Sequence, residues 1–316
     1  MKAMVITAFG GPEVFEQRDV PKPEAGPGEV LVRVKATSIN PLDYKIREAG
    51  AWAGVQPPAV IGYDVAGTVV AVGPGAQDFA PGDLVYYTPD VPGRGGSYAE
   101  FHVARQSIVA SMPRNLSFEE AASIPLAGGT AWLALITRGQ LHVGETVLIH
   151  AGAGGVGSLA VQIARAAGAY VFATCSPGNR DLVQELGAHR VIDYHSEDVT
   201  GVVLAETAGR GVDFTFDTVG GKTLEQSVAA TRPHGRIVSV VSNTGNINDA
   251  HFKNITVHFT FLERQRHTLD HLRPLLERGQ IRAVIDSIMP LEEVAEAHRR
   301  VERGGVRGKV VLTVPD

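Results

Sequence analysis

The residues whose types and spacing say most about chemistry form the run Gly152-Ala153-Gly154-Gly155-Val156-Gly157. An apolar run, Val147–Ile149, precedes it, and an apolar-periodic segment follows to Ala167. A strand, a turn spaced G-x-G-x-x-G and a helix are, in this order, typical of dinucleotide-binding folds. The first glycine permits the tight turn, the second admits a pyrophosphate, and the third lets helix and strand pack closely. We predict that this run binds a dinucleotide, whose phosphates face the positive end of the helix. A glycine-rich turn with a purely structural role is the alternative.

The end of the next predicted strand, Tyr170–Thr174, indicates which dinucleotide is bound. Proteins that bind NAD usually place a carboxylate about 20 residues after the first glycine, where it bonds the ribose 2′-hydroxyl. Here no carboxylate appears before Asp181, and a hydroxyl, an amide and a guanidinium, which suit a 2′-phosphate, come instead. The alternative is that the guanidinium is solvated at a helix start and that Asp181 lowers the selectivity. We predict NADPH rather than NADH, with a 2′-phosphate pocket made by Ser176, Asn179, Arg180 and Tyr194.

Metal ligands are scarce in this sequence. The chain has one cysteine, Cys175, so a structural zinc site of the four-cysteine kind is impossible. A catalytic zinc needs three protein ligands, and the eleven histidines are scattered along the chain. His267 and His271 stand four residues apart in a predicted helix but lack the glutamate of an H-E-x-x-H motif. A solvated helix face explains this pair better, and we predict no metal.

The elements that must position these residues divide the chain into two domains. Residues 1–122 contain short runs rich in Val and aromatic residues, separated by Gly and Pro, which are typical of a small β-barrel. From residue 123 to residue 262, predicted strands and helices alternate after a capping box at Ser117 and Glu120, which indicates a doubly wound parallel sheet of the Rossmann type. Residues 263–316 are expected to return to the first domain. The predicted fold is therefore α/β, with a Rossmann domain and a barrel-like domain.

Composition excludes some classes of function. The net charge of −5 argues against a general nucleic-acid-binding surface. A single cysteine excludes an intramolecular disulfide and suits a reducing compartment, and no run approaches the ~20 apolar residues of a membrane span. The N-terminal residues lack an apolar stretch of signal-peptide length. We predict a cytoplasmic protein that binds neither nucleic acid nor membrane.

Several longer motifs resemble a known family over nearly the whole chain. They include the opening MKAMVITAFGGPEVFE, then SINPLDYKIR at 38–47, GYDVAGTV at 62–69, DTVGG at 217–221 and GKVVL at 308–312. Together these resemble the medium-chain dehydrogenase/reductase superfamily, and within it the zinc-free, zeta-crystallin-like NADPH:quinone oxidoreductases and their enone or enal reductase relatives. Zinc-dependent members of the superfamily carry a cysteine near position 38 and a G-H-E motif where this chain has Gly62-Tyr63-Asp64. The resemblance therefore also implies a site without zinc.

This resemblance implies a GroES-like catalytic domain at 1–122 and 263–316, a Rossmann NADP-binding domain at 123–262 and a cleft between them. The cleft would be lined by the loop Asn40–Tyr44 and by Tyr63. Tyr44 and Tyr63 are then the expected donors to the substrate oxygen, with Asn40 and Asp43 beside them. The alternative is that Tyr63 only packs the cleft floor and that Asn40 and Asp43 only cap and fix their loop. Further cofactor contacts are expected at Thr130, Thr218, Val219, Val241, Ser242, Asn243 and Lys309.

The last strand expected in the Rossmann domain, residues 255–262, alternates strongly in hydrophobicity. An exposed edge strand of this kind is a template for pairing, and the resemblance suggests that two subunits join here into a homodimer.

The leading functional interpretation is an NADPH-dependent reductase of quinones that uses no metal. The alternative is an NADPH-dependent reductase of enones and enals. A zinc alcohol dehydrogenase and a non-enzymatic nucleotide-binding protein, with a structural or RNA-binding role, are weaker alternatives.

Overall fold

The computed structural model describes residues 1–315, and the chain divides into two compact units. Unit 1 comprises residues 1–127, 264–279 and the segment from Ala283 on, and unit 2 comprises residues 128–263 and 280–282. The boundaries predicted from the sequence, at residues 122 and 263, lie close to this division.

Unit 2 is built on a six-stranded parallel sheet with the strand order β11-β10-β9-β12-β13-β14. This order grows outward in both directions from the first strand of the unit, which confirms the predicted doubly wound sheet of the Rossmann type. The strands are β9 (Thr146–Ile149), β10 (Tyr170–Cys175), β11 (Arg190–Asp193), β12 (Val212–Asp217), β13 (Thr231–Ser239) and β14 (Thr256–Phe259).

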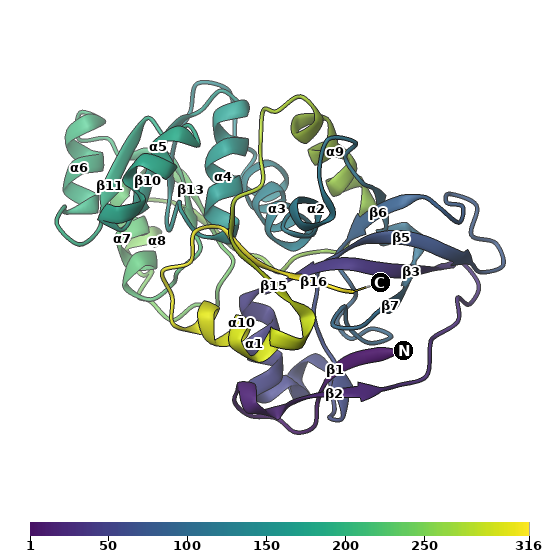
Figure 1. Ribbon diagram of the computed structural model, residues 1–316. Helices are drawn as coiled ribbons and strands as arrows, with labels where there is room; N and C mark the ends of the chain where they lie inside the picture. The colour runs from purple at the N-terminus through teal and green to yellow at the C-terminus, as the bar shows by residue number, and fades with distance from the viewer. Residues whose placement is uncertain (316) are drawn as a thin grey trace. The chain divides into compact units, whose positions relative to one another are not determined.

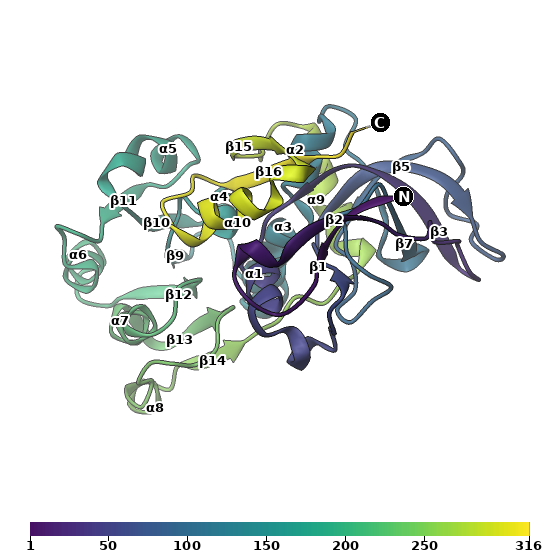
Figure 2. The same ribbon diagram turned by 60° about the horizontal axis from the view of Figure 1, so that its bottom comes forward.

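Helices cover both faces of this sheet, as Figure 2 shows for α4 and α5 on one face and α6 and α7 on the other. Strand β9 is buried between these layers from Val147 to Ile149, and Leu148 packs with Phe172 of β10 and Ile192 of β11. An apolar strand buried on both faces is typical of parallel sheets. The helices are α3 (Pro125–Trp132), which begins in unit 1, α4 (Gly155–Ala166), α5 (Arg180–Glu185), α6 (Val199–Glu206), α7 (Lys222–Ala230) and α8 (Asp249–Phe252).

Unit 1 contains a seven-stranded sheet in which β15-β16-β3-β5-β6-β8 are neighbours and β7 pairs with β3. Figure 1 shows β16, from the end of the chain, beside β3, from its beginning. The tail therefore returns to the N-terminal sheet, as predicted. The strands of this sheet are β3 (Glu29–Ser38), β5 (Val65–Val72), β6 (Leu84–Tyr87), β7 (Phe101–Arg105), β8 (Ala110–Ser111), β15 (Ile285–Pro290) and β16 (Lys309–Thr313).

A smaller three-stranded sheet and four helices complete unit 1. Ser117 caps α2 by accepting the Glu120 N–H at 3.2 Å, and the Glu120 carboxylate accepts the Ser117 N–H at 2.9 Å, which confirms the predicted capping box. The small sheet has the order β2 (Phe15–Asp19), β1 (Lys2–Ile6) and β4 (Ala59–Val60), and the helices are α1 (Pro41–Ala49), α2 (Phe118–Ala122), α9 (Arg266–Glu277) and α10 (Val294–Glu302).

Three predicted elements differ in the structure. The strand predicted at 255–262 is shorter, because β14 pairs with β13 only from Arg236 to Ser239 and has no partner strand beyond Phe259. The predicted loop Asn40–Tyr44 is the first turn of α1, since Asn40 is its N-cap residue and Pro41 occupies its first position. The apolar segment Leu126–Thr137 predicts one helix from the sequence, but the structure is α-helical only to Trp132 and continues as a π-helix over Leu133–Arg138.

Within residues 1–315, no helix is both long enough and apolar enough to span a bilayer.

Candidate active site

The glycine run of unit 2 lies between the end of β9 and the start of α4. Gly152 donates its N–H to the Thr174 carbonyl at 2.7 Å, which holds the turn against the end of β10. Gly154 is the N-cap residue of α4 and has no side chain with which to cap it. The first N–H groups of a helix have no partner within the helix, so this terminus presents donors to an anion.

Two glycines of this run are required for different reasons. A Cβ atom at Gly157 would lie 2.1 Å from the Ala151 carbonyl oxygen, so the close approach of helix and turn excludes any side chain. A Cβ atom at Gly154 would meet only that same oxygen, at 3.4 Å, and its φ of −77° suits any residue. Packing therefore does not demand glycine at residue 154. A pyrophosphate that approaches the backbone here would require glycine at residue 154, so the turn fits a bound dinucleotide.

Ser176, Asn179 and Arg180 follow the end of β10, as expected for a ribose-binding region. Asn179 Nδ2 donates to Ser176 Oγ at 3.0 Å, which leaves the Ser176 hydroxyl proton to donate elsewhere. Arg180 donates to the Val191 carbonyl at 3.1 Å and to Glu197 at 3.0 Å. The guanidinium predicted to bind a 2′-phosphate thus already holds a carboxylate. Tyr194 is exposed and follows β11, with its N–H on the Cys175 carbonyl at 3.3 Å.

The ends of β12 and β13 carry further residues predicted to contact the cofactor. Buried Asp217 accepts the N–H groups of Val219 and Gly220 at 3.1 and 3.0 Å and the Ser239 hydroxyl at 3.0 Å, which fixes the loop after β12. Thr218 donates to the His150 carbonyl at 3.0 Å, and Val219 is half exposed. Residues 241–243 follow β13, and Thr130 is buried in α3.

His150 joins three elements of unit 2 at the end of β9. Its ring nitrogens contact Thr174 Oγ1 at 3.4 Å and Ser227 Oγ at 3.2 Å, so β10 and α7 both meet it. Burial lowers the pKa of His150 to about 4, although Asp217 opposes this shift. The ring is neutral at physiological pH and links the end of β9 to β10 and α7 through these contacts.

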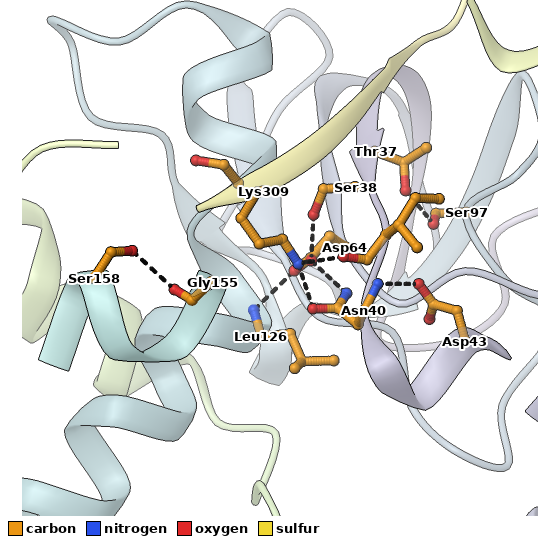
Figure 3. Close-up of polar contacts among 12 residues, drawn as sticks. Thr37, Ser38, Asn40, Asp43, Asp64, Ser97, Leu126, Gly155, Ser158 and Lys309 are labelled. Carbon is orange, nitrogen blue, oxygen red and sulfur yellow. Dashed lines mark hydrogen bonds and ion pairs between the residues drawn. The ribbon is translucent and has the colours of Figure 1, made fainter. Parts of the chain in front are cut away.

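In unit 1, polar groups converge on the buried carboxylate of Asp64 (Figure 3). Ser38 Oγ and Asn40 Nδ2 donate to Oδ2 at 2.6 and 2.7 Å, and the Leu126 N–H donates to Oδ1 at 2.8 Å. Burial raises the pKa of Asp64, whereas these donors and the Lys309 ammonium, 3.4 Å from Oδ2, oppose the rise. Both oxygens of this buried carboxylate therefore have hydrogen-bond donors, which offset part of the cost of burying it.

Lys309, predicted to contact the cofactor, directs its ammonium group to acceptors of unit 1. Nζ bonds the Ile39 carbonyl at 2.8 Å and Asn40 Oδ1, and it faces Asp64 (Figure 3). Burial lowers the pKa of Lys309, and the neighbouring carboxylates oppose that shift. An ammonium has three donors, and each has an acceptor here, so a contact of Lys309 with the cofactor remains a prediction.

A second chain of hydrogen bonds ends on Asp43, at the third position of α1. Asp43 Oδ2 accepts the Asn40 N–H at 2.7 Å and the Tyr98 hydroxyl at 2.9 Å. His298 Nε2 lies 3.2 Å from that hydroxyl, and Arg47 Nη1 lies 3.0 Å from His298 Nδ1. Because Arg47 can only donate, Nδ1 accepts and Nε2 carries the proton. Arg47 therefore donates to His298, His298 donates to the Tyr98 hydroxyl, and this hydroxyl donates to the Asp43 carboxyl.

Asp43 is the second buried acid of this group. It is fully buried, and its Oδ1 has no hydrogen-bond partner in the described structure. Burial raises the pKa of Asp43 to about 7, although the Asn40 N–H, Lys309 and Tyr98 lower it. A proton on Oδ1 would leave both bonds to Oδ2 in place, so the carboxyl can carry or release a proton near neutral pH.

The two tyrosines predicted to donate to substrate differ in their surroundings. Tyr44, on α1, is half buried, and its pKa is raised by burial and by Glu48 and Glu302. Tyr63 is almost fully buried, and burial and Asp43 raise its pKa well above the ordinary value. Both hydroxyls are therefore protonated at physiological pH and can act as donors.

The residues at the positions of the zinc ligands do not fit zinc. Ser38 and Tyr63 supply hydroxyls that stay protonated, and the cation next to Asp64 is the Lys309 ammonium. Within residues 1–315, no group of three or more His, Cys, Asp or Glu side chains is placed to hold a metal ion.

Sequence reasoning missed several residues of these networks. Asp64 belongs to the motif at 62–69, but the sequence alone indicates only that it replaces the glutamate of the G-H-E motif. Tyr98 and His298 carry no local signal, because they are 200 residues apart and meet only in the fold. Glu197 could have been found, since it follows β11 within one turn of the predicted Tyr194.

Comparison with known proteins agrees with this architecture. Residues 26–114 match the family described as "Alcohol dehydrogenase GroES-like domain", and residues 186–312 match "Zinc-binding dehydrogenase". A Pseudomonas aeruginosa protein named "Quinone oxidoreductase" is 34% identical, over 98% of this chain and 99% of its own length. An Arabidopsis thaliana protein named "NADPH-dependent alkenal/one oxidoreductase, chloroplastic" is 33% identical, over 99% of this chain and 79% of its own.

A solved structure described as a NAD-dependent alcohol dehydrogenase superimposes with a TM-score of 0.93 at 35% identity, covering all of both chains. The similarity therefore extends over both units, and the names of similar proteins include both nicotinamide cofactors.

Proposed function

We propose that this chain, which belongs to the quinone oxidoreductase family of the medium-chain dehydrogenase/reductase superfamily, transfers hydride from NADPH to quinones. The chain is an oxidoreductase of this family. Enones and enals form the second class of acceptor, because their carbonyl oxygen gains negative charge in the same way when hydride arrives. The proposal depends above all on Gly154. A Cβ atom there would have room in the fold, and the residue stands at the N-terminus of α4, which no side chain caps.

The nicotinamide supplies the hydride when it is bound, and the chain's own residues hold it and its acceptor. Residues 152–157 would contact the pyrophosphate. Thr130, Thr218, Val219 and residues 241–243 are the proposed contacts of the nicotinamide half. The buried carboxylate of Asp217 supports this part of the proposal, because it keeps the loop after β12 in one conformation.

For the cofactor, we favour NADPH over NADH. Ser176 can donate its hydroxyl proton to a 2′-phosphate because its oxygen already accepts from Asn179. Arg180 adds a guanidinium at the same place, and Tyr194 is exposed beside it.

For the acceptor, we propose Tyr44 and Tyr63 as hydrogen-bond donors to the developing oxyanion. Raised pKa values keep both hydroxyls protonated. Asn40 and Asp43 then act behind them: Asn40 links Lys309 and Asp64, and Asp43 accepts the Asn40 N–H in the first turn of α1. Reaction without zinc is supported by the donor set around Asp64 and Tyr63.

For the assembly, we propose a homodimer through the free edge of β14. This strand is the last of its sheet, and Phe259 and Phe261 are about half exposed beside it. An edge strand with exposed aromatic residues is a pairing template.

The test is steady-state oxidation of NADPH and NADH with 1,4-quinones, 2-enals and simple alcohols, together with zinc analysis of the active protein. We expect quinone turnover, a higher kcat/KM with NADPH and no stoichiometric zinc. Turnover of alcohols with zinc retained would contradict the proposal, and equal kcat/KM for the two cofactors would remove its NADPH component.

A further inference from the structure

We propose that Glu197 sets how strongly the nucleotide site of unit 2 discriminates between cofactors with and without a 2′-phosphate, and that its negative charge weakens this discrimination. The inference rests on the proposed function, because it assumes that unit 2 binds a nicotinamide dinucleotide at residues 152–157.

The geometry of Arg180 is the first observation. Arg180 begins α5, just after β10, at the place where a 2′-phosphate is expected. Its Nη2 bonds Glu197 Oε2 at 3.0 Å, and its Nη1 bonds the Val191 carbonyl at 3.1 Å. The guanidinium is therefore paired with a carboxylate before any phosphate arrives. A phosphate must displace Glu197 or bind to an arginine whose charge is already compensated.

The second observation is how firmly Glu197 is held. Its Oε2 also accepts the Asp193 N–H at 2.8 Å, and its Oε1 accepts from Arg190 Nη2 at 2.5 Å. These donors lower the pKa of Glu197 to about 2, so the side chain is ionised at physiological pH. A phosphate cannot gain by protonating this carboxylate.

The charges around Arg180 weaken its attraction for a dianion. Arg190 divides its donors between Glu197 and Glu206, so the two arginines face two glutamates. Asp193 adds one more negative charge, and its pKa is lowered by bonds from Ser196 and from the His195 N–H. A 2′-phosphate would carry up to two further negative charges into surroundings with no positive excess.

The sheet brings this cluster to the nucleotide site. Strands β10 and β11 are parallel and end side by side, with Cys175 opposite Asp193. Ser176 and Tyr194 therefore begin neighbouring loops at the carboxyl ends of the strands. The glycine turn lies at the same end of the sheet, where the Gly152 N–H bonds the Thr174 carbonyl. Glu197 is thus placed beside the ribose position of a dinucleotide bound on that turn.

The experiment compares binding of adenosine 2′,5′-bisphosphate and 5′-AMP, which differ only by the 2′-phosphate, to the full-length chain by titration calorimetry. In Glu197→Gln the amide oxygen can still accept the Asp193 N–H, but the negative charge is removed. We expect affinity for adenosine 2′,5′-bisphosphate to rise roughly three- to ten-fold, with less gain at high salt. Affinity for 5′-AMP should stay unchanged.

Glu206→Gln is the matched control, because it removes the same charge from the same cluster but does not touch Arg180. Its effect should be clearly smaller. If thermal melting shows that Glu197→Gln does not fold, Glu197→Asp draws the carboxylate back from Arg180 and should give a smaller gain in the same direction.

Three results would separate the possibilities. If the unmodified chain binds neither nucleotide, the proposed nucleotide site itself fails. If it binds them but Glu197→Gln lowers or leaves unchanged the affinity for adenosine 2′,5′-bisphosphate, the role given to Glu197 is overturned. Equal gains for both nucleotides would overturn it as well, because the effect would not depend on the 2′-phosphate.

Discussion

At the scale of single residues, Asp43 is unusual because hydrogen bonds and burial act on it in opposite directions. Two donors on Oδ2 favour its charged form, and complete burial favours its neutral form. Burial has the larger effect. The consequence is an acid that titrates near neutral pH inside unit 1, next to Tyr98 and within the electrostatic reach of Tyr63, Asp64 and Lys309.

The first prediction concerns stability and pH. The pKa of Asp43 rises from 3.8 to about 7 on folding, so the folded state binds the proton more tightly and loses stability as pH rises through this range. Asp43→Asn removes this loss. Relative to the variant, the free energy of unfolding of the unmodified chain should fall by about 4 kcal/mol from pH 4 to pH 8. Urea unfolding at several pH values measures the difference.

Asp181→Asn, which removes an exposed carboxylate on α5, is the control and should show no such trend. A difference between the chain and Asp43→Asn that does not change with pH would mean that Asp43 stays ionised when buried.

The second prediction concerns the proposed hydroxyl donor Tyr63. Tyr63→Phe keeps the ring that fills its buried site and removes only the hydroxyl group. We expect kcat with a 1,4-quinone to fall roughly 10- to 100-fold, because one donor to the developing oxyanion is lost. The dissociation constant of NADPH should not change. Tyr170→Phe, in β10, is the control, and unchanged kcat in Tyr63→Phe would assign Tyr63 to packing alone.

At the scale of elements, the two glycines of the turn have different reasons to be glycine: the fold requires Gly157, whereas a bound ligand would require Gly154. The third prediction uses this difference. Gly154→Ala should melt within about 2 °C of the unmodified chain, because its Cβ meets only one atom at a permissible distance. Its affinity for NADPH should fall by about ten-fold or more, because the methyl group occupies the position of the pyrophosphate.

Gly157→Ala is the contrasting variant, since its Cβ would collide with the Ala151 carbonyl oxygen. It should lose about 1–3 kcal/mol of stability, measured by urea unfolding. If Gly154→Ala binds NADPH normally, the phosphates do not lie on this turn.

Elements differed in how well the sequence predicted them. The strands and helices of unit 2 can be predicted because they alternate and carry clear apolar patterns, and the sequence predicts a short strand at 190–193, the bounds that β11 has. Helix α1 was missed because its start, Asn40-Pro41, reads as a loop. Its capping and the partners of the Asn40 side chain, Lys309 and Asp64, are set by the fold. The end of β14 was misplaced because the apolar alternation continues past the last residue of its partner strand.

The candidate site shows the same division between local and distant information. The glycine turn and Ser176 could be predicted, since each belongs to a local pattern after a strand. The pairing of Arg180 with Glu197 could not, because a sequence does not say which carboxylate a guanidinium meets. Lys309 was expected at the cofactor, and its acceptors are residues that come some 270 positions earlier.

At the scale of the whole molecule, the open edge of the unit 2 sheet supports the fourth prediction. The Thr260 N–H bonds the Ser239 carbonyl of β13. Because the backbone N–H groups of successive residues in a strand point to opposite sides, the N–H of Phe259 points away from β13, to the open edge of the sheet. Phe259→Pro should therefore leave the bonds to β13 in place and block pairing with a second copy. By light scattering, the mass should fall from twice the 33.5 kDa of one chain to a single chain.

Phe252→Ala is the control, since it removes an exposed aromatic side chain on α8 but no group of the strand edge. It should remain a dimer. An unmodified chain that is already monomeric at micromolar concentration would contradict the proposed assembly.

The position of β16 between β15 and β3 has a consequence for biosynthesis. The central sheet of unit 1 includes strands from both ends of the chain, and the pair formed by Lys309 and Asp64 joins residues 245 positions apart. Strand β3 is synthesised long before β16, so its residues Ala36–Ser38 lack this neighbour until residues 309–313 exist, although β5 and β7 reach β3 earlier. Unit 2, which is almost continuous in sequence, can close earlier. During translation the end of β3 at Ala36–Ser38 thus keeps an unpaired strand edge until β16 is made, and such an edge on a nascent chain needs protection from pairing with other chains.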